Sequence, residues 1–558
     1  MRYYLIIISI LVGFMGCESV QSTDKSPEGF HLKLAPQALG NKTVNISAQL
    51  ILDVNVSLKE STVTSSTLYI QEAASTQKVP TSVQLVDQQI LLKPEVYLKT
   101  NTHYEIVVTT KVLTFDQRHL SSNLVIPFLT SADSPDVTSP SLNATLPANN
   151  ATNMERFGVI YFEFSEAIPS LYAKNLQILV KDNMGITVPG QTQYFDAFVS
   201  FIPDNNLTDG THYTATLDTT NIKDFAGHSY SGQNIESIDF DVNSGAVVES
   251  GRQHNTHSFA TAANINAIVS DHLQLYIGGS NGLDIVKFDF NNTTAHFVAL
   301  SHLPESTLGN VYTIEVNSSI NRAYVGSSKG FFILDISDLN NSFVINNYPK
   351  QVSITNPVQG YGIDVCNQSV YLAAANHGLI QLDITHENQI QLIHTIDTNS
   401  TVFDAICHNG EIVLADYNNG VNAFDINTIQ SKIIPSQTTK HARAIFATTQ
   451  STAPYFVASG IHGVKLLSGD VTPHFGKIDS ASYISNIITA EGSQLGYALV
   501  KHIGVGIFGL NPFPGPMTYQ YIPYDITAVG FMVIGGGINT IFVANKAGEI
   551  HAYTRFPT

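Results

Sequence analysis

The second half of the chain repeats a short apolar stretch, a tight polar turn that ends in glycine, and a second apolar stretch. Residues 323–337 (AYVGSSKGFFILDIS) are one copy. The turn glycine recurs at intervals of 41 to 48 residues, at Gly282, Gly330, Gly378, Gly420, Gly463, Gly504 and Gly548. Repeats of this length that hold several strands each are typical of propeller blades. The pattern therefore predicts a seven-bladed β-propeller over residues 246–558.

Each part of the repeat has a physical reason. Glycine reaches the positive φ of a tight hairpin turn without a steric penalty. The strand that follows is apolar at nearly every position, as in 331–334 (FFIL), which indicates a sheet buried on both faces. Asp335, Asp383 and Asp425 each come five residues after their glycine. We expect these carboxylates to cap turns rather than to bind a ligand.

The sequence of these copies resembles a known repeat. Residues 330–336 (GFFILDI) and 378–384 (GLIQLDI) are similar to the LVIVD repeat of bacterial propellers, which places aspartate between aliphatic residues after the glycine. The first copy carries its aspartate late, at Asp289, and the last three copies have Ser468, Gly509 and Tyr553 instead. The chain contains no tryptophan, which argues against the WD40 version of the fold.

The last blade is short of one strand, because the chain ends soon after its third strand. We expect the segment Gly245–Gln253 to supply the outer strand. This pairing would join the two ends of the ring and remove exposed sheet edges.

Two further β domains precede the propeller. Residues 29–133 alternate apolar and polar positions over short stretches, as in 50–56 (LILDVNV), which predicts an Ig-like β-sandwich. In 134–245 the segments 147–153 (PANNATN), 164–166 (FSE), 210–214 (GTHYT) and 224–228 (DFAGH) resemble the bacterial Ig-like modules of the S-layer (SbsA) type. His228 stands where that family has asparagine. The resemblance implies a stalk or spacer, and 100–104 (TNTHY) indicates that the first sandwich is a diverged copy.

The N-terminus predicts export. A single arginine and a twelve-residue apolar run, Tyr3–Phe14, are typical of a signal peptide and too short for a membrane span. Gly16 before Cys17 resembles the bacterial lipoprotein cleavage site, which implies a signal peptide at 1–16, lipidation of Cys17 and a polar tether at 17–28. Glu18 is similar to the outer-membrane sorting pattern. An ordinary secretory signal with a chance cysteine is the alternative.

The net charge and the cysteine content limit the kinds of partner and covalent link that we expect. The net charge is −18, so a nucleic acid is a poor partner. Cys366 and Cys407 are the two cysteines besides Cys17, and their offset positions in neighbouring blades predict buried free thiols rather than a disulfide.

The sequence contains no catalytic or nucleotide-binding motif that we can identify. His377 and His462 occupy equivalent turn positions in blades three and five, where we expect solvated side chains, and we expect neither a metal nor a cofactor. Aligning the inner strands places Asp404, Arg443 and Asn486 in a polar arc along the channel. This arc could clamp a small polar ligand, or Arg443 and Asp404 could form a plain salt bridge. Propellers that are hydrolases hold a metal ion with several acidic side chains in the channel. Among the residues aligned here to face the channel, only Asp404 is acidic.

These observations predict an all-β envelope lipoprotein: two Ig-like sandwiches, then a propeller that binds an envelope protein or an extracellular ligand in an adhesion, scaffold or assembly role. Its membrane contact would be the lipid at Cys17. The tyrosine-rich and proline-rich loop 511–524 is a candidate contact surface. The alternatives are a periplasmic or surface hydrolase or lyase acting in the channel, and a structural coat protein. A cluster of strongly shifted channel acids would favour the enzyme.

Overall fold

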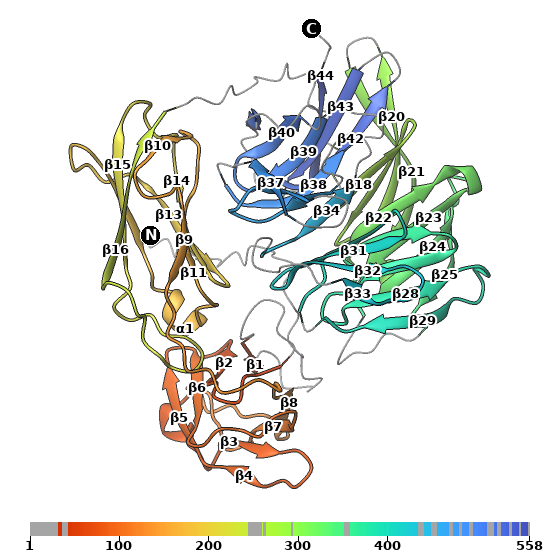
Figure 1. The fold of residues 1–558 in the computed structure, drawn as a ribbon. Helices are drawn as coiled ribbons and strands as arrows, with labels where there is room; N and C mark the ends of the chain where they lie inside the picture. Colours follow the sequence, from red (N-terminus) through yellow and green to blue (C-terminus); the bar gives the residue numbers. More distant parts are fainter. Residues whose placement is uncertain are drawn as a thin grey trace, which may run out of the picture. The chain divides into compact units, whose positions relative to one another are not determined.

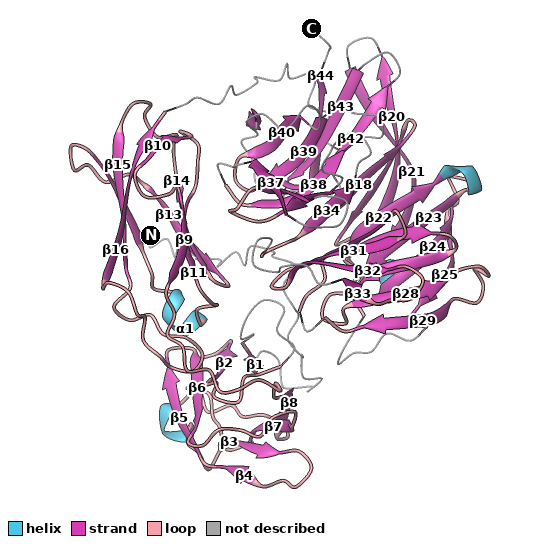
Figure 2. Cartoon of the chain, in the orientation of Figure 1, coloured by secondary structure: helices cyan, strands magenta, loops and turns pink. Residues whose placement is uncertain are grey.

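The protein is nearly all β-structure (Figures 1 and 2). The computed structural model describes residues 32–35, 43–243, 259–260, 264–291, 294–350, 358–398, 400–432, 440–447, 455–467, 473–478, 482–489, 495–509, 518–521, 526–534, 538–545 and 548–555. The chain divides into two compact units, Met1–Asp136 and Val137–Thr558. The predicted signal peptide, Cys17 and tether lie outside the described residues.

The first unit is a sandwich of two four-stranded sheets, ordered β1-β2-β6-β5 and β4-β3-β7-β8. The strands are β1 (Leu32–Leu34), β2 (Leu50–Val54), β3 (Leu68–Glu72), β4 (Lys78–Val79), β5 (Thr81–Val86), β6 (Gln89–Pro94), β7 (His103–Val108) and β8 (Leu124–Leu129). The strands alternate buried and exposed positions where one face meets the core, as in β8, whose burial alternates from residue to residue. The predicted Ig-like sandwich is confirmed.

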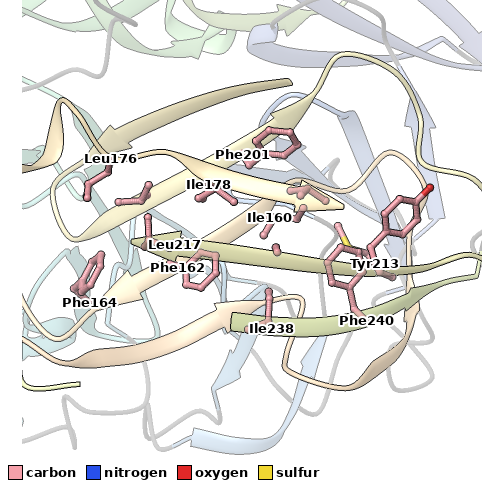
Figure 3. Packing of buried hydrophobic residues seen from close by; sticks show 14 of the residues in the cluster. Ile160, Phe162, Phe164, Leu176, Ile178, Phe201, Tyr213, Leu217, Ile238 and Phe240 are labelled. Carbon is pink, nitrogen blue, oxygen red and sulfur yellow. The ribbon is translucent and has the colours of Figure 1, made fainter. Parts of the chain in front are cut away.

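The second unit begins with a sandwich ordered β9-β11-β14-β13 and β10-β16-β15-β12. The strands are β9 (Leu142–Leu146), β10 (Ala151–Met154), β11 (Ile160–Phe164), β12 (Ile178–Asp182), β13 (Gly190–Phe195), β14 (Phe198–Pro203), β15 (His212–Asp218) and β16 (Ile235–Val242). Figure 3 shows Phe162, Leu217 and Ile238 within the core between its sheets. Asp224 is fully buried and accepts hydrogen bonds from the N–H and the ring of His228, so it caps its turn.

The two sandwiches share their internal connectivity. In one sheet of each module, the third strand in the sheet order is the second strand of a hairpin, β6 in the first module and β14 in the second. The other sheet of each module contains a parallel pairing at its edge, between Val44 and Thr130 in the first module and between β10 and β16 in the second. The hydroxyl of Tyr104 accepts the N–H of Lys99 at 3.1 Å, and the hydroxyl of Tyr213 accepts the N–H of Thr208 at 2.9 Å. This shared tyrosine geometry supports the inference that the first module is a diverged copy.

The remainder of the second unit is the predicted seven-bladed propeller. Seven four-stranded sheets occur among the described residues, each a run of antiparallel strands from the inner to the outer edge. The blades are β18–β21 (Ile265–Asp271, Gln274–Gly279, Gly282–Asn291, Thr294–Pro304), β22–β25 (Val311–Asn317, Arg322–Ser327, Gly330–Asp335, Phe343–Tyr348), β26–β29 (Gly362–Cys366, Ser369–Ala373, Leu379–Asp383, Gln391–Ile396), β30–β33 (Asp404–His408, Glu411–Asp416, Gly420–Asp425, Ser431–Lys432), β34–β37 (Ala444–Ala447, Tyr455–Ala458, Val464–Leu467, Pro473–Ile478), β38–β41 (Ile484–Thr489, Leu495–Val500, Gly504–Gly509, Thr518–Tyr521) and β42–β44 (Ile526–Ile534, Ile538–Asn545, Glu549–Arg555) with β17 (Phe259–Ala260).

The blades form a closed ring. Each inner strand lies against the next one from β18 to β38, β42 lies against β39 of the sixth blade, and β42 returns to β18. The outer strand of the last blade is β17, which pairs antiparallel with β44 through Phe259 and Ile550. A strand from the start of the domain thus completes the last blade, as predicted. The strand is Phe259–Ala260 and not the expected Gly245–Gln253, a segment that lies outside the described residues.

The repeat turns have the expected backbone. All seven turn glycines adopt positive φ, between 74° and 138°. Asp335, Asp383 and Asp425 each accept the N–H of the residue two positions later, at 2.8 to 3.0 Å. The prediction that these aspartates cap turns is confirmed, and local backbone geometry explains why aspartate follows the glycine at this spacing in these three blades.

The prediction of free thiols is wrong. Cys366, at the end of β26, and Cys407, in β30, form a disulfide with their Cα atoms 6.4 Å apart. The inner strands of neighbouring blades lie side by side, and their relative shift brings the two cysteines together although they are offset in the repeat. The disulfide joins blades three and four.

Candidate functional site

The inner strands line the channel of the propeller. On each inner strand, the residue that we expect to face the channel should be more exposed than the next residue, which we expect to face the neighbouring blade. Thr313 and Asp404 are half-buried, whereas the following Ile314 and Ala405 are buried. The same contrast holds for the aligned pairs of blades one, five, six and seven, while Gly362 of blade three departs from it. Side chains that line a narrow channel are expected to be half-buried. The burial of these residues therefore agrees with their predicted position at the channel wall.

Asp404 and Asn486 of the predicted arc lie on inner strands β30 and β38, and Arg443 directly precedes inner strand β34. Asp404 and Asn486 bind backbone groups. Asp404 accepts the N–H of Ala405 through Oδ1 at 3.0 Å and that of Ile445 through Oδ2 at 3.1 Å. The Oδ1 atom of Asn486 accepts the N–H of Ile487 at 2.7 Å. The hydrogen bond from Ile445 crosses from blade five to blade four.

The guanidinium of Arg443 packs on aromatic rings. Its guanidinium carbon lies 4.3 Å from the ring centre of Phe403 and 5.4 Å from that of Tyr417. Burial favours the neutral form, but the neighbouring Tyr483 and Tyr417 side chains outweigh it and raise the pKa of Arg443. The arginine is therefore a cation held on aromatic faces.

Two further acids line the channel, and the sequence alignment missed them. Glu315 and Asp364 lie two residues beyond the aligned positions of blades two and three, on the same face of their strands. Asp364 accepts the N–H of Cys407 at 2.6 Å, and Glu315 accepts the N–H of Val365. Considering alternate positions along each inner strand, rather than one aligned position, would have found both.

Together these acids link consecutive blades. Glu315 reaches from blade two to blade three, Asp364 from blade three to blade four, and Asp404 from blade four to blade five. The inner strand is an edge strand of its blade and pairs with only one neighbour, which leaves N–H groups that need acceptors. The carboxyl groups supply these acceptors, which gives them a structural role.

The same acids have raised pKa values. Burial raises the pKa of Glu315 to about 8, and the nearby charge of Asp364 adds to this effect. Burial also raises the pKa of Asp404 to about 7, and raises that of Asp364. Glu315 is therefore largely protonated at neutral pH, which lowers the cost of placing three acids on adjacent strands.

Aromatic rings follow the same blades. The ring centres of Tyr312 and Tyr361 are 4.6 Å apart, those of Tyr361 and Phe403 are 5.6 Å apart, and those of Phe403 and Tyr417 are 5.5 Å apart. Arg443 packs at the end of this row of rings. The row is largely buried, so it stabilises the contacts between blades two to five.

The second Ig-like module packs on the propeller within the same unit. Val159, Tyr161 and Phe198 share a buried apolar cluster with Ile461 and Tyr483 of the propeller. The hydroxyl of Tyr161 lies 3.0 Å from that of Ser482, and the hydroxyl of Tyr417 donates to Asp196 at 3.1 Å. The module and the propeller therefore share a buried core that hydrogen bonds between the two domains cross.

The prediction that His462 is a solvated turn residue is wrong. Its Nε2 atom lies 3.1 Å from the buried carboxylate of Glu163 in the Ig-like module. Sequence periodicity within the propeller carries no signal for this contact, because Glu163 lies in another domain. His377, at the equivalent turn of blade three, is half-buried.

The proposed contact loop 511–524 is largely outside the described residues. The structure places strand β41 within it and describes none of its side chains. In the described part of the chain, no helix has the length and apolar character that a membrane crossing requires.

Comparison with known proteins supports the module assignment. Residues 136–242 match a family model described as Bacterial Ig-like domain. A comparison with curated proteins finds no match.

Solved structures resemble the chain at 11% identity. They include the computationally designed Ika8 protein (TM-score 0.40, covering 55% of this chain and 100% of that one), a chain of the mitotic checkpoint complex (0.44, 55% and 94%) and the RRP9 WD40 repeats (0.41, 56% and 99%). The propeller assignment itself depends on the strand pairing within this chain.

Proposed function

We propose that this protein is a cell-envelope lipoprotein, anchored through Cys17 to the outer membrane, whose propeller binds a protein or an extracellular ligand. Its role would be adhesion, scaffolding or assembly. An Ig-like module joined to a propeller is suited to protein interaction, because both present loops on rigid β-structure. The Ig-like modules carry the propeller as a stalk.

The disulfide supports the cellular location. Disulfides persist in the periplasm and outside the cell and are rare in the bacterial cytosol. The bond between Cys366 and Cys407 therefore agrees with export through the predicted signal peptide.

The observation that carries the binding role is how the channel uses its polar side chains. Asp364 and Asp404 hydrogen-bond to backbone N–H groups of the next blade, and Arg443 packs on Phe403. Groups committed to the fold are poorly placed to act on a substrate. This arrangement favours a propeller that is a rigid frame for surface loops.

The anchor is tested by metabolic labelling with an alkyne fatty acid in a bacterial host. The wild-type chain should be labelled and should sediment with the outer membrane. The Cys17→Ala variant should lose the label, and equal labelling of both chains would overturn the proposed anchor.

The binding role is tested with purified chain and isolated cell envelopes of a bacterium. We expect saturable binding, and pre-treatment of the envelopes with protease or with glycosidases distinguishes a protein partner from a glycan. The Glu315→Gln variant should bind equally well, because this side chain faces the channel. Absence of saturable binding would contradict the proposal.

A channel hydrolase or lyase is the second candidate, and Glu315 favours it. Its pKa near 8 suits a general acid, and its Oε2 atom is buried without a hydrogen-bond partner. A panel of ester, lactone and glycoside substrates tests this candidate. Turnover by the wild-type chain that Glu315→Gln abolishes would establish the enzyme in place of the binding head.

A further inference from the structure

Three metal-ligating side chains meet where the Ig-like module packs on the propeller. Glu163 comes from β11 of the module, His441 precedes β34, and His462 lies in the turn between β35 and β36. Nε2 of His441 lies 2.8 Å from Oε1 of Glu163, and Nε2 of His462 lies 3.1 Å from Oε2. Two imidazoles from one blade thus face the two oxygens of one carboxylate.

The spacing of these atoms fits a small divalent cation. One ligand atom from each residue can be chosen so that all three lie within 4.8 Å of one another. In a tetrahedral zinc site with bonds of about 2.0 to 2.1 Å, neighbouring ligand atoms are about 3.3 Å apart. The contacts of 2.8 Å to Oε1 and 3.1 Å to Oε2 are each within about half an ångström of this separation, and all three chosen ligand atoms lie within 4.8 Å of one another.

The donor set has the chemistry of a transition-metal site. Two histidines and one carboxylate bind zinc and related ions, and leave one coordination position for water.

The surroundings would shield a bound ion from bulk water. The side chain of Glu163 is 1% exposed and that of His441 is 8% exposed. The rings of Phe198 and Tyr417 lie 5.0 and 5.1 Å from the His441 ring. A buried carboxylate needs a compensating charge, and the structure gives Oε2 of Glu163 no hydrogen bond of good geometry.

We propose that Glu163, His441 and His462 bind a divalent transition-metal ion of the zinc class. The ion would tie the second Ig-like module to blade five of the propeller. Because the ligands come from two domains that are far apart in the sequence, the site exists only when the module is docked. Metal binding would then stabilise the docked arrangement. This inference does not depend on the proposed partner of the propeller.

The test uses the full chain, purified without a histidine tag and stripped with a chelator. Zinc chloride is titrated by calorimetry, and the melting temperature is measured with and without the ion. We expect one zinc per chain and a rise in melting temperature. Cobalt(II) should give the visible absorption of a four-coordinate site, a signal that hydrogen bonds within the triad cannot produce.

The matched variants are Glu163→Gln, His441→Gln and His462→Gln, with His377→Gln as the control at the equivalent turn of blade three. Each ligand substitution should weaken zinc binding at least about tenfold and remove the thermal shift, while the control should bind as the wild type does. Absence of stoichiometric binding, or binding that the ligand variants leave unchanged, would overturn the proposal. A triad held only by hydrogen bonds would make the variants less stable equally with and without zinc, and this too would overturn it.

Discussion

Cys366 and Cys407 join the inner strands of two adjacent blades through a disulfide that spans 41 residues of sequence. The carboxyl of Asp364 accepts the N–H of Cys407 beside this bond. Blades three and four are thus connected covalently and by a hydrogen bond at the channel wall, where the two sheets do not pair with each other.

Removing the disulfide should lower stability. The chain-entropy relation gives about 4 kcal/mol for a closed loop of this length. We expect Cys366→Ser with Cys407→Ser to unfold at a lower urea concentration than the wild type. Wild-type chain treated with a reductant should match the double variant, and identical unfolding curves with and without reductant would contradict the bond.

Glu315 should make stability fall as the pH rises. Its pKa is raised from 4.5 to about 8, so the folded chain holds a proton that the unfolded chain has released between these values. Each pH unit in that window should cost about 1.4 kcal/mol at most for this group. Urea unfolding of the wild type and of Glu315→Gln, measured from pH 5 to 8.5, tests this difference.

The Glu315→Gln variant should show a flatter dependence on pH over the same window. Glu95→Gln, which changes an exposed side chain in the first module, is the control and should leave the wild-type profile unchanged. Parallel profiles for the wild type and Glu315→Gln would show that the carboxyl titrates normally in the folded chain.

Two glycines with similar backbone conformations should respond differently to alanine. Gly378 has φ of 74° and Gly410 has φ of 79°. A Cβ at Gly378 would collide with the carbonyl oxygen of Ile396 in the outer strand, whereas one at Gly410 meets nothing within 4 Å. Gly410→Ala should cost about 1 to 2 kcal/mol for the left-handed conformation alone.

Gly378→Ala should cost more, because the outer strand of blade three must also move. Thermal or urea unfolding of the two variants measures the difference. Equal losses would show that the turn conformation, and not the approach of the outer strand, requires glycine at position 378.

The tyrosine hydroxyls of the two Ig-like modules should contribute equally. Tyr104→Phe and Tyr213→Phe each remove one hydrogen bond to the backbone N–H five residues earlier. We expect a loss of about 1 kcal/mol for each variant in the unfolding of the compact unit that contains it. Tyr97→Phe, at a 64% exposed side chain, is the control and should be neutral. A neutral Tyr104→Phe would argue against a shared origin of this feature.

The sequence by itself determined the architecture of this protein. The spacing of the repeat predicted seven blades because each blade needs a glycine at its tight turn. The turn caps formed by aspartates such as Asp335 follow from local backbone geometry alone. The motifs around Phe164 and Tyr213 identified the second Ig-like module for the same reason, since short-range patterns encode turns and strand faces.

Only the tertiary structure decided the contacts between repeats and between domains. The relative shift of inner strands pairs Cys366 with Cys407 and brings the carboxyl groups of Glu315 and Asp364 to N–H groups of the next blade, and no periodicity within one blade encodes that shift. The meeting of Glu163 with His441 depends on how two domains pack, which side-chain complementarity over distant segments determines. For this reason the fold could be predicted from local signals, whereas the candidate sites could not.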